Sequence, residues 1–359
     1  MDSKQKYKVL GLMSGTSLDG VDIACCTFQL KSAQWQFKIE KAVTIPYTSS
    51  WTAKLSTAHL LSGEQLLELH AAYGTYLGER CKKFMQLYGI RQVDFIASHG
   101  HTIFHQPEKQ FTFQLGDLHA LHVASGKPVV GDFRSLDVAL GGQGAPLVPI
   151  GDQLLFQEYD VCLNLGGIAN ISQQVKGKRV AFDVCFANMG LNYLASKAGK
   201  AYDDGGKMAA DGELNSRMLS ALSTVYTKIN VEKPSLGREF FEQKIKPILD
   251  REETSLPDKL HTFTESIAIA IASSLQYSKK RITVLCTGGG AFNAYLLYRM
   301  IEHCGDRADL VVPDADVVKF KEALVFAFLG IRRVRSEINC LKSVTRASRD
   351  SSSGVLVGF

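Results

Sequence analysis

Three short loops of this 359-residue chain combine glycine with hydroxyl, amide or carboxylate side chains, a composition suited to holding phosphate. Backbone N–H groups beside glycine can point at phosphate oxygens, and hydroxyls add donors without bulk. The first loop, GLMSGTSLDG, provides Gly11, Ser14, Gly15, Thr16, Ser17 and Asp19. The Asp19 carboxylate is placed to hold Mg²⁺ directly or through water. The loop lacks the Walker lysine, and by itself it is better explained as a hairpin turn with an aspartate cap.

Two further glycine turns follow apolar runs that predict strands. They are LNLGGIANIS, with Gly166, Gly167 and Asn170, and LCTGGGAFN, with Gly288, Gly289, Gly290 and Asn293. Neither has the G-x-G-x-x-G spacing of a dinucleotide-binding fold, so each is a weak signal alone. Three such turns in one chain favour a nucleotide site over three unrelated turns.

Asp183 is the candidate general base. It ends the apolar run KRVAFD, which predicts a position at the carboxyl end of a strand, where catalytic groups of α/β folds usually stand. An aspartate there is as often a helix N-cap, and Asn188, Asp203 and Asp204 compete for the role.

Other polar side chains could contact a ligand. Arg134 lies in the polar segment GDFRSLDVALGGQGAP and is suited to grip an anion, although a surface ion pair is the alternative. Thr102 follows His99 and His101 in SHGHT, where hydrogen bonding to a polar ligand or a structural role is favoured over zinc, because no thiol or carboxylate stands at ligand spacing. Glu322 lies on an apolar helix and either reaches solvent or faces a ligand.

Composition indicates an ordinary two-domain protein. A chain of 359 residues with 45% hydrophobic content exceeds the usual size of one core, and a net charge of +5 does not indicate a nucleic-acid or membrane partner. No apolar run resembles a signal peptide or a membrane span, which predicts a cytoplasmic protein. The eight cysteines form no C-x-x-C pair and predict reduced core residues.

The order of predicted elements favours an α/β fold with mixed or parallel sheets and a ligand cleft between two domains. Helical spacing predicts helices at 63–88 and 320–335. The expected organisation is an N-terminal domain at 1–150, a C-terminal domain at 151–335 and a mobile tail at 336–359, with the helix near 320–340 able to pack back on the first domain.

Taken together, these segments resemble the anhydro-N-acetylmuramic acid kinases of peptidoglycan recycling, members of the sugar kinase, Hsp70 and actin superfamily. The resemblance covers nearly the whole chain in order. It runs through GLMSGTSLDGVDIA, SHGHTIFHQP, FTFQLGD, GDFRSLDVALGGQGAPLVP, LNLGGIANIS, GREFF, TGGGAFN and KEALVFAFLG. It implies a duplicated ribonuclease H-like fold with a central cleft.

The resemblance also implies the chemistry. ATP phosphates would lie between MSGTSLDG and LNLGGIAN with Mg²⁺, and TGGGAFN against the adenosine. Asp183 would deprotonate a water that attacks the anomeric carbon while O6 takes the γ-phosphoryl group. Thr102, Arg134 and Glu322 match positions that hold the sugar or its lactyl carboxylate, and Asn188 is assigned to the substrate with them.

Two departures from the family pattern stand out. The usual FDTGPGN reads FDVCFAN at 182–188, which keeps Asp183 and Asn188 but loses both glycines, and the usual SHGQT reads SHGHT. The first change is expected to affect substrate selection. The alternatives are a kinase for a related sugar with a free hydroxyl and a catalytically silent nucleotide-binding module. A homodimer is expected on base rates alone.

Overall fold

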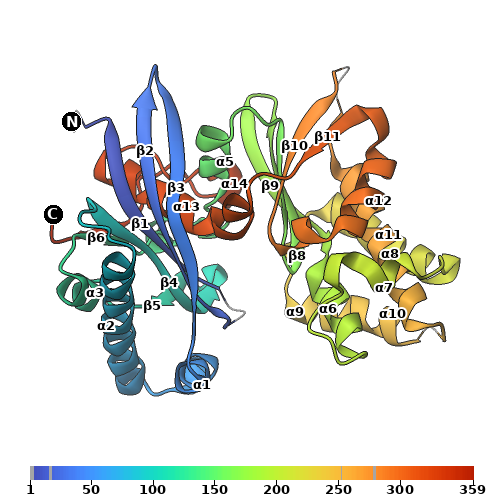
Figure 1. Cartoon of the computed structure of the whole chain (residues 1–359), viewed down its shortest axis with the longest axis horizontal. Helices are drawn as coiled ribbons and strands as arrows, with labels where there is room; N and C mark the ends of the chain where they lie inside the picture. The colour runs from blue at the N-terminus through green and yellow to red at the C-terminus, as the bar shows by residue number, and fades with distance from the viewer. Residues whose placement is uncertain (1–3, 16–17, 252, 278–279) are drawn as a thin grey trace. The chain divides into compact units, whose positions relative to one another are not determined.

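The computed structural model describes residues 4–15, 18–251, 253–277 and 280–359, which form two compact units (Figure 1). Unit 1 comprises Met1–Phe156 and Phe320–Phe359, and unit 2 comprises Gln157–Lys319. Each unit is a β-sheet packed with helices, so the predicted α/β class is confirmed. None of the helices among the described residues is long and apolar enough to cross a membrane.

Unit 1 is built on a sheet that has seven strands among the described residues, in the order β12-β6-β4-β1-β2-β3, with β5 paired to β4. The strands are β1 (Lys6–Ser14), β2 (Gly20–Lys31), β3 (Gln34–Pro46), β4 (Phe95–Gln106), β5 (Phe111–Leu115), β6 (Val129–Gly131) and β12 (Val355–Val357). The helices of the N-terminal segment are α1 (Ser49–Thr57), α2 (Gly63–Leu87), α3 (Leu118–Ser125), α4 (Ser135–Ala139) and α5 (Pro149–Leu155). Because β1, β4 and β6 are parallel, their carboxyl ends share one edge of the sheet.

Alternation along β1 divides its side chains between two helical layers. Leu10 and Leu12 pack with Tyr73 and Leu77 of α2 in one core. The opposite face lies under α13 (Ala315–Val334), where Phe328 stacks on Phe28 with ring centroids 5.7 Å apart. The sheet is therefore covered on both faces, as its apolar strands require.

The predicted helix at 63–88 is α2, and its N-terminus is determined by capping residues in the local sequence. The Ser62 side chain accepts from the Gln65 backbone N–H, and the Gln65 side chain accepts from the Ser62 N–H. This reciprocal capping box satisfies two of the otherwise free donors of the first turn.

Unit 2 has a five-stranded sheet among the described residues, in the order β11-β10-β7-β8-β9. Its strands are β7 (Val161–Leu165), β8 (Ile168–Val175), β9 (Lys178–Phe186), β10 (Ile282–Thr287) and β11 (Ala308–Val311). Its helices are α6 (Asn188–Ser196), α7 (Lys207–Ala210), α8 (Ser216–Glu232), α9 (Arg238–Phe240), α10 (Lys246–Arg251), α11 (Leu256–Ser274) and α12 (Ala294–Cys304). Residues of β7, β9, α8 and α11 share one core, which includes Leu163, Phe186, Leu222 and Phe263.

The C-terminal segment differs from its prediction in two ways. Helix α13 begins at Ala315, five residues before the expected start, and loses helical geometry at Phe320 (φ −114°, ψ 16°), where unit 1 resumes. The prediction of a mobile tail is wrong. The tail contains α14 (Lys342–Thr345), and β12 pairs antiparallel with β6. All eight cysteines are buried, and none of these described residues forms a disulfide.

Gly11 is expected to be required for folding. It lies inside β1, and a Cβ there would fall 1.9 Å from the backbone carbonyl oxygen of Ala323 in α13. Gly11→Ala should therefore lower the free energy of unfolding by about 3 kcal/mol or more, measured by urea denaturation. Gly63→Ala, where nothing lies within 4 Å, is the control and should be neutral or stabilising.

Candidate functional site

The first glycine loop follows β1, but its members have different positions. Gly11 is part of the strand and serves close packing, as described above. Gly15 and Asp19 flank the turn, where the Leu18 N–H donates to the Gly15 carbonyl at 3.4 Å and Asp19 is exposed. The predicted contacts Thr16 and Ser17 lie outside the described residues.

Ser14 is buried, and its hydroxyl belongs to a polar network behind the loop. Its Oγ lies 2.6 Å from the Tyr47 hydroxyl and 2.8 Å from His101 Nδ1, and the Tyr47 hydroxyl is 2.5 Å from that of Tyr73. Burial lowers the pKa of His101 to about 4, so its ring is neutral at physiological pH. The side chains of Ser14 and His101 thus brace the end of β1.

Arg134 is held by two partners in unit 1. Its Nε and NH2 groups lie 2.9 and 2.8 Å from His99 Nε2, and its NH1 group donates to the Gly144 carbonyl at 2.6 Å. His99 Nδ1 lies 2.9 Å from the Gly100 carbonyl, which fixes the tautomer that leaves Nε2 free to accept. Burial and the adjacent Arg134 charge hold the pKa of His99 well below its usual range. Burial also lowers the pKa of Arg134 to about 10, so the guanidinium stays charged at neutral pH.

Glu322 and Thr102 lie in the same unit. The Glu322 side chain is solvent-accessible, yet desolvation by the surrounding protein raises the pKa of its carboxyl, an effect that the Arg134 charge opposes. The Gln114 side-chain amide lies 3.5 Å from Thr102 Oγ1 and donates to Thr112 Oγ1 at 2.8 Å. The structure therefore brings Arg134 and Glu322 within electrostatic range, while Thr102 is tied to β5.

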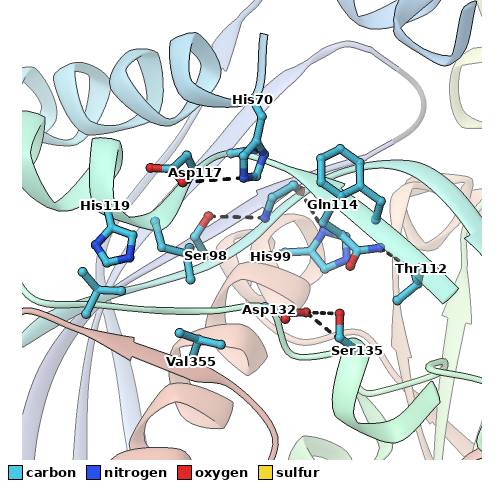
Figure 2. A pocket seen from close by; sticks show the side chains of 15 residues that line it. His70, Ser98, His99, Thr112, Gln114, Asp117, His119, Asp132, Ser135 and Val355 are labelled. Atoms are coloured by element: carbon cyan, nitrogen blue, oxygen red, sulfur yellow. Dashed lines mark hydrogen bonds and ion pairs between the residues drawn. The ribbon is translucent and has the colours of Figure 1, made fainter. Parts of the chain in front are cut away.

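A cavity of about 280 Å³ opens beside these residues in unit 1 (Figure 2). Its lining includes Ser98 and His99, together with Asp117, 3.7 Å from His70 Nε2, and Asp132, which accepts from the Ser135 hydroxyl at 2.5 Å. Thr102, Arg134 and Glu322 are not among the lining residues, so this cavity and the predicted sugar contacts are neighbours rather than one site.

The two glycine turns of unit 2 meet at one edge of its sheet. They follow β7 and β10, which are parallel neighbours, so their carboxyl ends coincide. Asn188, predicted to contact substrate, is hydrogen-bonded to the first of these turns: its Nδ2 donates to the Leu165 carbonyl at 3.1 Å, and its N–H donates to the Gly166 carbonyl. A Cβ on Gly290 would fall 2.8 Å from Leu165 Cβ.

The remaining predicted nucleotide contacts surround this edge. The Gly167 carbonyl accepts from the Ala187 and Met189 N–H groups, and Gly289 lies near the Asn188 amide. The Asn293 side chain caps α12. Asn170 pairs with Asp183 across β8 and β9.

Gly288 offers a direct test of this packed edge. Its φ is +82°, and a Cβ would lie 2.6 Å from Asn164 Oδ1 and 2.9 Å from the Leu165 backbone. Gly288→Ala should weaken binding of a non-hydrolysable ATP analogue roughly tenfold or more by calorimetry, because the loop must shift. Gly305→Ala shares a positive φ but has open space around it, and should leave nucleotide affinity unchanged.

Asp183 lies inside β9 rather than at its end, which corrects the prediction. The strand continues to Phe186, and the register shifts so that Asn170 faces Asp183 while Ala169 faces Cys185. This irregularity re-aims the side chain. The Leu236 N–H donates to Asp183 Oδ2 at 2.9 Å, and burial raises the pKa of the carboxyl.

The three carboxylates that compete for the role of base have different surroundings in the structure. Asp183 caps none of the helices in the described part of the chain, whereas Asp203 accepts from the N–H groups of Met208 and Ala209 and holds the start of α7. Asp204 is exposed and pairs with Lys207. Asp183 therefore remains the candidate base among these three.

The residues of FDVCFAN that differ from the family pattern lie in the apolar core of unit 2. Val184, Cys185, Phe186 and Ala187 are all buried, and they belong to the main apolar cluster of unit 2. Cys185 and Ala187 therefore place buried side chains where the family pattern has glycine, and none of the four lines an open loop.

Sequence reasoning missed the residues that hold the candidate groups. The sequence predicts a ligand contact for His99 and does not reveal that it is the acceptor for Arg134. Gly144 lies in the quoted GGQGAP turn, but nothing in that motif identifies its carbonyl as a partner of Arg134, and the Leu236 N–H carried no motif signal. Each holds its partner through backbone geometry or a distant pairing that composition does not reveal.

Comparisons with known proteins cover almost the entire chain. The model of the family "Anhydro-N-acetylmuramic acid kinase" matches residues 7–358. The anhydro-N-acetylmuramic acid kinase of Mannheimia succiniciproducens is 34% identical, covering 98% of this chain and 99% of its own, and that of Vibrio vulnificus strain CMCP6 is 33% identical, covering 99% of both. A ROK family glucokinase from Streptomyces griseus, solved with glucose and AMPPNP, aligns over 89% of this chain and 97% of its own with a TM-score of 0.39 and 11% identity, a likeness too distant to carry an argument.

Proposed function

The chain belongs to the anhydro-N-acetylmuramic acid kinase family, and from that premise we propose how its residues perform the reaction. It is an ATP-dependent sugar kinase of peptidoglycan recycling. The enzyme opens the 1,6-anhydro bridge with water and phosphorylates O6, giving N-acetylmuramic acid 6-phosphate. The substrate has no free 6-hydroxyl, because O6 closes the bridge, so a base that activates water is needed.

We assign that base to Asp183, and its geometry is the observation that carries the proposal. One carboxylate oxygen is fixed by the Leu236 N–H, while Oδ1 has no hydrogen-bond partner among the described residues. The raised pKa makes the carboxylate a better proton acceptor than an ordinary aspartate. Asp183 takes a proton from water, the water oxygen bonds to the anomeric carbon, the C1–O6 bond breaks, and O6 takes the γ-phosphoryl group as ADP leaves.

The sugar is held by unit 1 in this proposal. Three of the five guanidinium N–H groups of Arg134 are engaged by His99 and Gly144. One N–H on each terminal nitrogen is left without a partner among the described residues, and such a pair suits a carboxylate such as the lactyl group. Glu322 and Thr102 would hydrogen-bond to the sugar, the Glu322 carboxylate by accepting from sugar hydroxyls and the Thr102 hydroxyl by donating or accepting.

ATP is assigned to the glycine turns. The turns after β7 and β10 supply backbone N–H groups at one sheet edge, and the loop after β1 supplies further donors. Asp19 fits a role in holding Mg²⁺, because it is an exposed carboxylate beside that loop and kinases bind this ion through one or two carboxylates plus phosphate oxygens. When bound, Mg²⁺ neutralises charge on the transferring phosphoryl group.

Location and assembly complete the proposal. We place the enzyme in the cytoplasm, where its eight buried thiols would remain reduced. A homodimer is proposed because two-fold dimers are the commonest assembly of soluble enzymes.

Isotope labelling tests the function. Purified protein with ATP, Mg²⁺ and the anhydro-sugar in ¹⁸O-water should give the 6-phosphate with the label on the anomeric hydroxyl and none in the phosphoryl group. Absence of product, or label in the phosphate alone, would contradict the proposal. Faster turnover of a sugar with a free 6-hydroxyl would favour a conventional kinase.

A further inference from the structure

The loop that holds Arg134 is itself held by the C-terminal segment of the chain. Several hydrogen bonds join them. Ser353 Oγ donates to the Phe133 carbonyl at 2.7 Å, the Ser348 N–H donates to the Leu140 carbonyl at 3.0 Å, the Gln143 N–H donates to the Thr345 carbonyl at 2.7 Å, and Thr345 Oγ1 donates to Asp137 Oδ1 at 2.7 Å. These hydrogen bonds therefore anchor the segment from Phe133 to Gly144 at several positions.

Asp137 is the centre of this arrangement and is only 1% exposed. Its Oδ1 accepts from Thr345 Oγ1 and from the Cys340 thiol at 3.0 Å, and its Oδ2 accepts from the Gly144 N–H at 2.8 Å. A buried carboxylate with three donors has a fixed position, since each donor would be left unsatisfied if it moved.

Gly144 links the fixed Asp137 carboxylate to Arg134 through two hydrogen bonds. Its N–H is held by Asp137, and its carbonyl accepts from Arg134 NH1. The residue has φ +66°, and a Cβ would lie 2.7 Å from Val138 Cγ2, so its backbone has little freedom. With His99 on the other side, the guanidinium is fixed from two directions.

We propose that Asp137 is a positioning residue for the sugar site, which holds Arg134 through Gly144 and is itself anchored by Cys340 and Thr345. The proposal rests on the proposed function, in which Arg134 grips the substrate carboxylate. It makes the C-terminal segment part of the scaffold for substrate binding. Bidentate recognition depends on the orientation of the guanidinium plane, so loss of this anchor should weaken sugar binding more than it slows the chemical step.

The central test compares Asp137→Ala with Asp94→Ala. Asp94 Oδ2 likewise accepts a backbone N–H, from Lys8 at 2.8 Å, at the opposite end of β4. Asp137→Ala should raise the Kd for the anhydro-sugar, measured by calorimetry, roughly ten- to hundredfold, while kcat at saturating sugar and the affinity for an ATP analogue change little. Asp94→Ala should leave all three values near those of the wild type.

Two further variants keep the test informative if Asp137→Ala does not fold. Asp137→Asn should restore binding, because its amide oxygen can accept from Gly144 while its NH₂ faces the Thr345 and Cys340 atoms, which can accept. Thr345→Val leaves the carboxylate but removes one of its donors, and should raise the Kd roughly two- to fivefold.

A double-mutant cycle with Arg134→Lys completes the design. Lysine lacks the planar fork, so Asp137→Ala in that background should add little to the Kd. Equal Kd for Asp137→Ala and Asp94→Ala, or full additivity with Arg134→Lys, would overturn the inference. Wild-type turnover is measured first: an inactive wild type contradicts the proposed function, whereas an active wild type with either of these results contradicts this inference alone.

Discussion

Asp183→Asn is expected to lower kcat for the anhydro-sugar by roughly 10²- to 10⁴-fold, the usual range for loss of a general base. The amide cannot take the proton from water, but its oxygen can still accept from the Leu236 N–H, so the local structure should persist. ADP release measured with a coupled assay gives the rate, and calorimetry with an ATP analogue should show unchanged nucleotide affinity.

The same variant should not be destabilised at neutral pH. The pKa of Asp183 is raised in the folded state, so folding disfavours its ionised form, and stability is lost as the pH rises through that pKa. Removing the charge should therefore leave the free energy of unfolding at pH 7 unchanged or higher. The acid limb of kcat/KM in the wild type should likewise lie above the pH expected for an ordinary aspartate.

Asp160→Asn is the matched control for the base. Asp160 Oδ2 accepts from the Thr283 N–H at 2.8 Å, at the start of β7 and away from its glycine turn. Its replacement should leave kcat within about twofold of the wild type. Retention of full activity by Asp183→Asn would remove this residue from the mechanism.

The second large effect concerns the buried ion pair between Lys321 of α13 and Asp152 of α5. The two charged atoms lie 2.7 Å apart, with side chains 8% and 4% exposed, and the ammonium also lies 5.3 Å from the Phe156 ring centroid. Lys321→Met or Asp152→Leu alone should lower the free energy of unfolding by about 3–5 kcal/mol, because each removes one member of a buried ion pair and leaves the other charge buried. Urea denaturation monitored by circular dichroism measures the loss.

The double replacement Lys321→Met with Asp152→Leu is the decisive comparison. Because it removes both charges and fills the space with apolar atoms, most of the lost stability should return. The surface pair Lys228 and Glu232, exposed on α8, serves as the control, and its removal should cost less than about 1 kcal/mol. Additive losses in the buried double variant would show that the pair is not coupled.

The sequence predicted those features whose cause is local. Helix α2 was expected at 63–88 and occupies Gly63–Leu87, because apolar spacing and the Ser62 capping box act over a few residues. The resemblance to a kinase family also rested on short contiguous motifs, and the family model matches residues 7–358.

Features caused by distant pairing were not predictable. The sequence alone predicts that Gly11 belongs to a phosphate loop, and only the fold shows the Ala323 carbonyl packed against it. The partners of Arg134, His99 and Gly144, are likewise identified only by the fold. The sequence predicts Asp183 at a strand end. The strand continues to Phe186 because the side chains from Val184 to Phe186 are buried in the core of unit 2, which the local sequence does not reveal.

The tail shows why composition misleads. Its serines, arginines and lone aspartate are typical of mobile termini. Here the hydroxyls of Thr345 and Ser353 are hydrogen-bonded inside unit 1, which gives these polar residues a structural role.

The discontinuous course of unit 1 sets an order of events during translation. Unit 2 is contiguous from Gln157 to Lys319, so it can fold as soon as the ribosome has released it. The face of the β1 sheet around Gly11 stays uncovered until α13 is made, and β6 lacks its antiparallel neighbour until β12 is made. A nascent chain arrested before α13 therefore leaves one face of this apolar sheet without its helix, and the residues of β1 are enclosed only after the much later residues of α13 have been made.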